Sequence, residues 1–127
     1  MRRPAIICGG RDFIGSHEAE AWLVLMLLRH AADVVIHGDQ EGADRWGARV
    51  AEMRLQLPAK KFPPEYERFG REEAPKVRNY QMAAEAAAHG RVPVCLAMPG
   101  GSGTGHMCGQ AGRFGIPVLK WRPGVKA

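Results

Sequence analysis

The segment VPVCLAMPGGSGTGHM (residues 92–107) changes character in its middle. An apolar run opens it, four glycines crowd residues 100–105, and a helix-like segment follows. A strand that ends in a glycine-rich loop and continues as a helix is the repeating unit of α/β folds. A loop so rich in glycine either turns the chain tightly or brings main-chain N–H groups close to a ligand.

The rest of the chain repeats this alternation. Strands are predicted over residues 4–8, 33–37, 58–62, 92–98 and 116–120, and helices over 16–31, 42–56, 73–89 and 104–114. The strands are apolar throughout, which is typical of a parallel sheet covered by helices on both faces. The sequence therefore predicts one α/β domain over residues 1–127. Its expected form is a three-layer Rossmann-like fold with a five-stranded, mainly parallel sheet of order 3-2-1-4-5.

Composition narrows the class of protein. With 127 residues, 46% of them hydrophobic, the chain can bury the core of a single domain. No apolar run approaches the roughly 20 residues that span a bilayer, so no membrane association is predicted. The three cysteines and five histidines lack metal-ligand spacing, so we predict neither a metal nor another cofactor, and a cytoplasmic location. Cys8 and Cys95 are expected to be small buried side chains within strands.

Two further features concern the second half of the chain. Residues 59–127 carry 11 Lys and Arg against 5 Asp and Glu, which favours either an anionic ligand or simply a solvated basic surface. The segment 62–75, rich in Pro and Glu, is predicted to be the one long irregular connection, and such connections often carry function.

The predicted strand order also locates a site. The order reverses between the first and fourth strands, and ligands of open α/β sheets bind beyond the strand ends at that point. The loops after these two strands both begin with glycines, so both are expected at the same crevice. The ligand-binding residues predicted there are Gly9, Gly10, Arg11, Pro99, Gly100, Gly101, Ser102, Gly103 and Thr104.

The fourth loop has the chemistry of a phosphate cradle. Glycines let N–H groups approach an anion, and the N-terminus of the next helix adds a partial positive charge. Ser102 and Thr104 are predicted to cap that helix and to donate to phosphate oxygens. Known fingerprints are absent, because no Gly-Lys-Ser/Thr ending is present and His106 stands where G-x-G-x-x-G requires its last glycine. The alternative to a cradle is a tight turn.

Other candidate residues leave two interpretations open. Asp44, which follows Gly42, either contacts a ribose or caps the helix that begins there, while Gly42 allows close approach of a ligand. Arg78, beside Asn79 on the third predicted helix, binds a phosphate or is a surface charge. Arg11 and Asp12 either contact the ligand or form an ion pair that braces the first loop.

Four motifs in order resemble a known family. CGGRDF (8–13), HGDQEGAD (37–44), VRNYQM (77–82) and MPGGSGTGHM (98–107) look like the YspA-like branch of the SLOG superfamily. That superfamily includes the LOG cytokinin-activating enzymes and the DprA/Smf proteins. The resemblance covers about residues 4–120. It implies a Rossmann-like domain that binds a nucleotide or nucleotide-derived small molecule, and the LOG-type proteins imply a homodimer.

The LOG enzymes hydrolyse the N-glycosidic bond of nucleoside 5′-monophosphates. Their motifs are P-G-G-x-G-T-x-x-E and R-K-x-x-M, and the matching residues in this chain are Pro99, Gly100, Gly101, Gly103, Thr104, Arg78 and Met82. Asn79 replaces the lysine, and Met107 occupies the glutamate position. A methionine can neither position water nor stabilise an oxocarbenium-like centre, so this departure weighs against the LOG reaction.

Three functions remain as expectations. The first is a sensor or binding domain in which residues 100–104 hold phosphate, Arg11 and Arg78 complement its charge, and Asp44 touches a ribose. The second is a phosphoribohydrolase-like nucleotide hydrolase whose catalytic candidates are Arg78, Asp12 and Asp44. The third is binding of single-stranded nucleic acid. This expectation is the weakest, because single-strand binders stack bases on exposed aromatic side chains and the chain has only nine aromatic residues.

Overall fold

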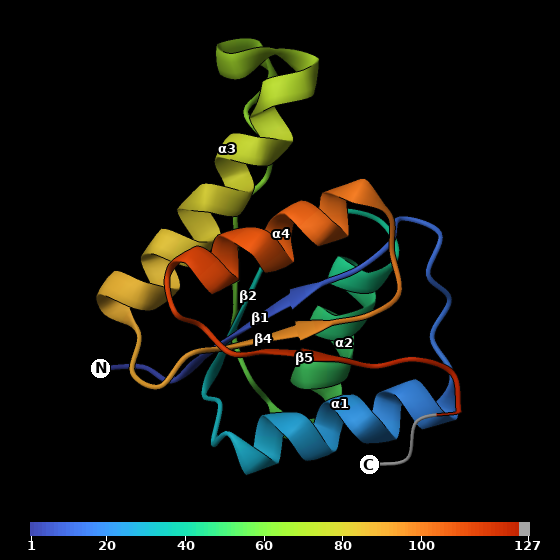
Figure 1. Cartoon of the computed structure of the whole chain (residues 1–127). Coiled ribbons are helices and arrows are strands. Elements are labelled where there is room, and N and C mark those ends of the chain that lie inside the picture. The colour runs from blue at the N-terminus through green and yellow to red at the C-terminus, as the bar shows by residue number, and fades with distance from the viewer. Residues whose placement is uncertain (125–127) are drawn as a thin grey trace.

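Five parallel strands form one sheet of order β3-β2-β1-β4-β5 in the computed structural model, which describes residues 1–124 (Figure 1). The strands are β1 (Pro4–Cys8), β2 (Val34–His37), β3 (Ala59–Lys61), β4 (Val94–Ala97) and β5 (Val118–Lys120), and the helices are α1 (His17–Arg29), α2 (Ala43–Leu55), α3 (Tyr66–His89) and α4 (Ser102–Arg113). The predicted fold class and strand order are confirmed.

Burial explains why the strands read as continuous apolar runs. Every residue of β1 and β4 is buried, because these central strands are covered on both faces. Ile6 of β1 lies between Ile36 of β2 and Cys95 of β4 in the parallel register. At the edge, the three residues of β3 are exposed, which accounts for the weak apolar signal of PAKKF.

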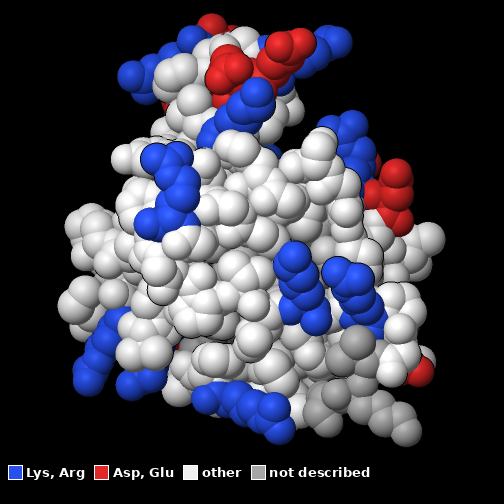
Figure 2. Space-filling view, viewed as in Figure 1, with Lys and Arg blue, Asp and Glu red and all other residues white. Residues whose placement is uncertain are grey.

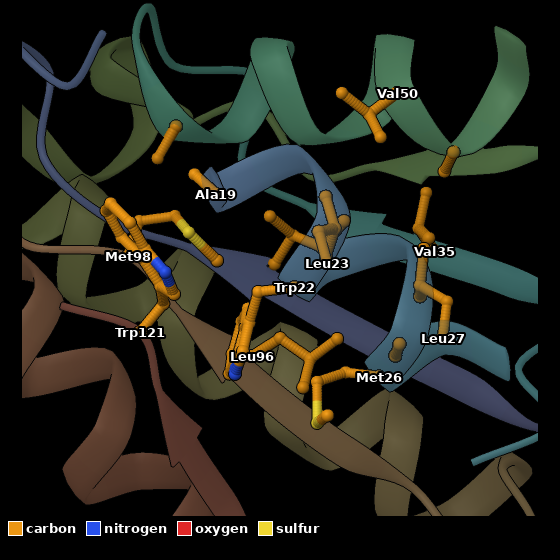
Figure 3. Packing of buried hydrophobic residues seen from close by; sticks show 14 of the residues in the cluster. Ala19, Trp22, Leu23, Met26, Leu27, Val35, Val50, Leu96, Met98 and Trp121 are labelled. Carbon is orange, nitrogen blue, oxygen red and sulfur yellow. The ribbon is translucent and has the colours of Figure 1, made fainter. Parts of the chain in front are cut away.

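Helices α1 and α2 cover one face of the sheet, and α3 and α4 cover the other (Figure 1). The α1 side holds the larger apolar cluster, in which Trp22 and Leu23 of α1 pack with Val50 of α2 and Leu96 of β4 (Figure 3). Burying side chains of this size contributes about 1.5–3 kcal/mol each. A second apolar cluster, which includes Ile6 of β1, Met82 of α3 and Met107 of α4, covers the other face of the sheet. Together the two clusters hold the sheet in place.

Local signals start α1 where the sequence suggests. The Ser16 hydroxyl accepts a hydrogen bond from the N–H of Ala19 at 3.1 Å, and Glu18 and Glu20 lie in the first turn. Both features stabilise a helix N-terminus. No helix within residues 1–124 is both long enough and apolar enough to cross a membrane.

The prediction of an irregular connection over residues 62–75 is wrong from Tyr66 onward. Helix α3 begins there and continues to His89, interrupted only at Gly70, where φ is 84° and ψ is 170°. The prolines and glutamates suggested a loop, but Glu72 and Glu73 fall in the first turn after Gly70, where carboxylates favour a helix. This part of α3 extends beyond the sheet at the top of Figure 1.

Candidate functional site

The loops after β1 and β4 meet at the carboxyl edge of the sheet. The N–H of Gly10 donates to the carbonyl of Pro99 at 2.8 Å, and the N–H of Met98 donates to the carbonyl of Cys8 at 2.9 Å. A side chain on Gly10 would lie 3.0 Å from the Pro99 oxygen, so glycine permits this approach. The two glycine-rich loops therefore form one crevice, as the strand order predicts.

Helix α2 is attached to the same crevice through Gly42. This residue precedes α2 with a φ of 85°, and the next N–H, from Ala43, donates to the carbonyl of Gly10 at 3.1 Å. A Cβ on Gly42 would overlap the carbonyl oxygens of Gly10 and Arg11. The close approach that we predicted for Gly42 is thus an approach to backbone of this chain.

Helix α4 presents an uncapped N-terminus at the crevice. Its N-cap residue is Gly101, which has no side chain that could accept a hydrogen bond from the first turn. The prediction that Ser102 and Thr104 cap the helix is wrong, because α4 begins two residues before the predicted start and both residues lie inside it. A Cβ on Gly101 or Gly103 would meet no atom within 4 Å. The first N–H groups of a helix have no partner within the helix, and anions bind at such helix N-termini in many proteins.

Asp44 and Arg78 hold the peptide groups of Gly38 from two sides. The N–H of Gly38 donates to Asp44 Oδ2 at 2.9 Å, and Arg78 Nη1 donates to the Gly38 carbonyl at 2.9 Å. The helix-cap interpretation of Asp44 is wrong, because its carboxylate reaches back across the β2–α2 loop. The surface-charge interpretation of Arg78 is also wrong, because only 8% of this residue is exposed. A ribose contact by Asp44 stays a prediction.

Asn79 joins α3 to the first turns of α4. Its Oδ1 accepts from Arg78 Nε at 3.0 Å, and its Nδ2 lies 3.0 Å from His106 Nδ1 and 3.5 Å from the carbonyl of Gly103. The amide therefore orients the guanidinium and positions α4 at the same time. The place of His106 beside α3 depends on helix packing, which the local sequence does not encode.

A small cavity of about 90 Å³ lies where these elements converge. It is lined by residues from β1, α2, α3, α4 and the connections after β1 and β2, namely Cys8, Gly9, Gln40, Asp44, Pro75, Arg78, Asn79, Met82, Gly103, Thr104 and Met107. Sequence reasoning missed Cys8, Gln40 and Pro75 as wall residues, because nothing in their spacing marks them. Met107, at the LOG glutamate position, thus lines the cavity with an apolar side chain.

A larger cleft of about 500 Å³ adjoins this cavity. The two share Gln40, Pro75 and Arg78 as walls, and the cleft adds Arg11 and Tyr66. Its volume lies within the range of about 300–1,000 Å³ that is usual for small-molecule sites. Arg78 consequently stands between a confined polar space and a cleft of ligand size.

A third cavity lies on the other side of the α4 N-terminus. Its volume is about 430 Å³, and its walls include Gly100, Gly101 and Thr104 together with Lys120 and Arg122. Of the predicted loop residues, Thr104 lines both this cavity and the 90 Å³ cavity, whereas Ser102 is exposed. The first turn of α4 therefore separates two spaces that both carry basic side chains.

Arg11 and Asp12 behave differently from each other. Both side chains are exposed, and among residues 1–124 no ion pair joins them, so the bracing ion pair is not found. Arg11 lines the 500 Å³ cleft, whereas Asp12 lies outside the walls of the cleft and of the 90 Å³ cavity. Of the two residues, Arg11 is the one placed to contact a ligand.

On the face seen in Figure 2, charged side chains are dispersed and are not gathered into one patch. Figure 2 shows Lys and Arg side chains spread across one face, with Asp and Glu concentrated over the N-terminal part of α3 and at one edge. Such a distribution attracts anions in general without selecting a position. The specific positive group at the crevice is the buried guanidinium of Arg78.

Burial shifts the pKa of both charged groups in the 90 Å³ cavity, Asp44 and Arg78. Desolvation raises the pKa of Asp44 from 3.8 to about 6, against the opposing effects of the Gly38 hydrogen bond and the Arg78 charge. Desolvation lowers the pKa of Arg78, which stays charged at neutral pH. The cavity therefore holds a permanent cation beside a carboxyl group that titrates near neutrality.

We expect Asp44 to make stability depend on pH. Because the folded chain binds this proton more tightly than the unfolded chain, the stabilisation from protonated Asp44 is lost as the pH rises from about 4 to about 6. Asp44→Asn keeps an acceptor for Gly38 and cannot titrate. Relative to the wild type, this variant should gain about 3 kcal/mol between these pH values, at about 1.4 kcal/mol per pKa unit.

Urea unfolding of the wild type and of Asp44→Asn at several pH values measures this gain, and the other carboxylates cancel in the difference. A difference between the two proteins that stays constant from pH 4 to pH 7 contradicts the raised pKa of Asp44.

Comparison of the chain with protein-family models, curated proteins and solved structures found no match. The fold defines a Rossmann-like parallel α/β domain with a crevice at its topological switch point.

Proposed function

We propose that this chain binds a nucleotide or nucleotide-derived ligand as a sensor or binding domain, with a phosphate group at the α4 N-terminus. One observation carries the proposal: a buried guanidinium and the uncapped first turn of a helix converge on the same cavity. Arg78 and the residues Gly103 and Thr104 are all walls of the 90 Å³ space. Each of these features favours an anion.

The hydrogen bonds of Arg78 leave part of its donor capacity free. Nε and Nη1 bind Asn79 and Gly38, whereas Nη2 has no hydrogen-bond partner among residues 1–124. Arg78 is a wall of both the 90 Å³ cavity and the 500 Å³ cleft, so a ligand in either space lies close to its guanidinium. A phosphate there would complete the coordination of the guanidinium.

The adjoining cleft suits the rest of a nucleotide. Its volume of about 500 Å³ accommodates a small organic molecule. Tyr66, 49% exposed, offers an aromatic surface at its wall, and aromatic rings stack on nucleobases with about 1–3 kcal/mol per base. Arg11, at the same wall, would meet a second phosphate or a ribose.

Membership of the YspA-like branch of the SLOG superfamily is part of the same proposal. The four motifs that carry this resemblance are placed together in space: CGGRDF, HGDQEGAD, VRNYQM and MPGGSGTGHM each contribute walls to the 90 Å³ cavity. Motifs that lie far apart in sequence and converge on one cavity support a shared ligand site.

A thermal-shift screen tests the proposal. The probes are AMP, other nucleoside monophosphates, NAD, ADP-ribose and cyclic dinucleotides. A nucleotide at 100 times its Kd should stabilise the fold by about 2.7 kcal/mol, which raises Tm measurably. If none of these compounds raises Tm and single-stranded DNA does so in a salt-dependent manner, the protein binds nucleic acid instead.

Gly101→Asp is expected to abolish the thermal shift given by the best nucleotide. The new carboxylate stands at the N-cap of α4, where it accepts the first-turn N–H groups and repels phosphate. The fold should tolerate the change, because a Cβ at Gly101 meets no atom within 4 Å. The readout is Tm with and without nucleotide.

Gly109→Asp provides the matched control. It adds the same charge to the same helix at an exposed glycine with equally open surroundings, away from the helix N-terminus. This variant should keep most of the nucleotide-induced shift. Equal losses in both variants would mean that net charge, and not the α4 N-terminus, governs binding.

Hydrolysis of the nucleotide is a second candidate, favoured by Asp44. Its carboxyl group is buried in the 90 Å³ cavity with a pKa of about 6, a value suited to general acid–base catalysis. Chromatography of the screened nucleotides for released base tests it. Release that disappears in Asp44→Asn would establish the hydrolase, whereas intact nucleotide supports a binding domain.

A further inference from the structure

The three cysteines of the chain meet in space although the sequence separates them widely. Cys8 ends β1, Cys95 lies in β4 and Cys108 lies in α4, which lies alongside these strands in Figure 1. Their three sulfur atoms all lie within 4.8 Å of one another, and the Sγ atoms of Cys8 and Cys95 are 3.9 Å apart. All three are free thiols.

The spacing of the sulfur atoms matches three ligands of one metal ion. A metal–thiolate bond of about 2.3 Å places the three sulfurs of a planar trigonal site about 4 Å apart. The Cys8–Cys95 distance of 3.9 Å already has this value, and the limit of 4.8 Å leaves Cys108 less than about 1 Å to move. A small rotation of the Cys108 side chain would complete the trigonal site.

The number and kind of donors select the ion. Thiolates favour soft cations such as Cu(I) and Zn²⁺. Structural zinc is almost always four-coordinate, and the cluster within residues 1–124 offers three sulfurs and no further His, Asp or Glu. A cation that accepts three-fold coordination therefore fits the donors better than zinc does.

Two basic side chains offset part of the charge of the cluster, and a cavity beside it admits an ion. Three thiolates and one monovalent cation carry two negative charges in a partly apolar environment. Lys120 attracts the thiolates of Cys95 and Cys108 electrostatically, and Arg78 attracts that of Cys8. Cys108 is only partly buried and lines the 430 Å³ cavity, which provides a route from solvent.

We propose that Cys8, Cys95 and Cys108 form a three-thiolate site for one Cu(I) ion. Binding exchanges three thiol protons for the ion, so the protons are released to solvent and no oxidant is needed. The site adjoins the proposed nucleotide site, because Cys8 is also a wall of the 90 Å³ cavity. It ties α4 to β1 and β4 through bonds to the metal.

The test is an anaerobic titration of the folded protein with Cu(I), kept reduced by ascorbate, in competition with a chromophoric Cu(I) chelator. We expect one ion per chain, a thiolate-to-copper absorption band in the ultraviolet, and a higher Tm. Cys108→Ser should weaken binding by more than about 100-fold, because loss of a direct ligand exceeds the 10–100-fold typical of supporting residues. Its partial burial makes this variant the one most easily tolerated by the fold.

Cys8→Ser and Cys95→Ser distinguish a built site from a single reactive thiol. Each should weaken binding as much as Cys108→Ser, with folding checked by circular dichroism. Unchanged affinity in either variant overturns the site. So does binding of Zn²⁺ with equal affinity, more than one Cu(I) per chain, or a band without any rise in Tm.

Discussion

Gly42→Ala should lower the free energy of unfolding by about 2–6 kcal/mol. A φ of 85° and a ψ of −128° are accessible to glycine, and another residue held there costs about 1–3 kcal/mol. The added methyl group would also overlap the carbonyl oxygens of Gly10 and Arg11, at a further cost of about 1–3 kcal/mol. Urea unfolding measures the loss, which should appear as a lower midpoint at an unchanged m-value.

Gly70→Ala is the control for the conformational part of this loss. Gly70 has a φ of 84°, close to that of Gly42, but a Cβ there would meet no atom within 4 Å. The variant should lose only the backbone contribution of about 1–3 kcal/mol. An equal loss in both variants would show that the overlap of the methyl group with the two carbonyl oxygens costs nothing.

Arg78→Met should weaken binding of the best nucleotide from the thermal-shift screen by about 10–100-fold. A hydrogen bond to a charged group contributes about 1.5–3 kcal/mol, and each 1.4 kcal/mol corresponds to a factor of ten in Kd. Methionine fills much of the same volume without the charge. Because the Gly38 carbonyl also loses its donor, the free energy of unfolding should fall by about 1–3 kcal/mol. Calorimetric titration of the folded variant measures Kd.

Two further variants locate the phosphate. Arg71→Met removes the same charge from an exposed position of α3 and should leave Kd almost unchanged. Arg122→Met removes a charge from the 430 Å³ cavity on the other side of the α4 N-terminus. If Arg122→Met weakens binding and Arg78→Met does not, the phosphate occupies that cavity and the proposed placement is wrong.

The architecture could be predicted from the sequence. Apolar runs such as PAIIC and VPVCLAM, separated by helix-length segments, specify a buried parallel sheet, because this periodicity is a local property of the chain. The same reasoning placed the loops after β1 and β4 at one crevice. It failed at residues 66–75, where prolines and glutamates suggested a loop but α3 begins at Tyr66. It also failed at Ser102, which lies inside α4 because Gly101 is the N-cap residue.

The hydrogen-bond partners of the candidate residues became known only from the tertiary structure. Asp44 and Arg78 are recognisable as polar residues in the sequence. Their hydrogen bonds to the backbone of Gly38 form only because β2, α2 and α3 pack together. The same holds for the contact between Asn79 and His106, which joins two helices. Sequence motifs indicate which residues are candidates, whereas the hydrogen-bond partners of these residues depend on how the helices and strands pack.

The cysteines show most clearly what could not be predicted from the sequence. Cys8 and Cys95 are 87 positions apart, and no short motif links either residue to Cys108. The sequence therefore predicted separate buried thiols and no metal. Their sulfurs converge because β1 and β4 are neighbours in a parallel sheet and α4 packs over them, and contacts of this range arise from chain topology and not from local spacing.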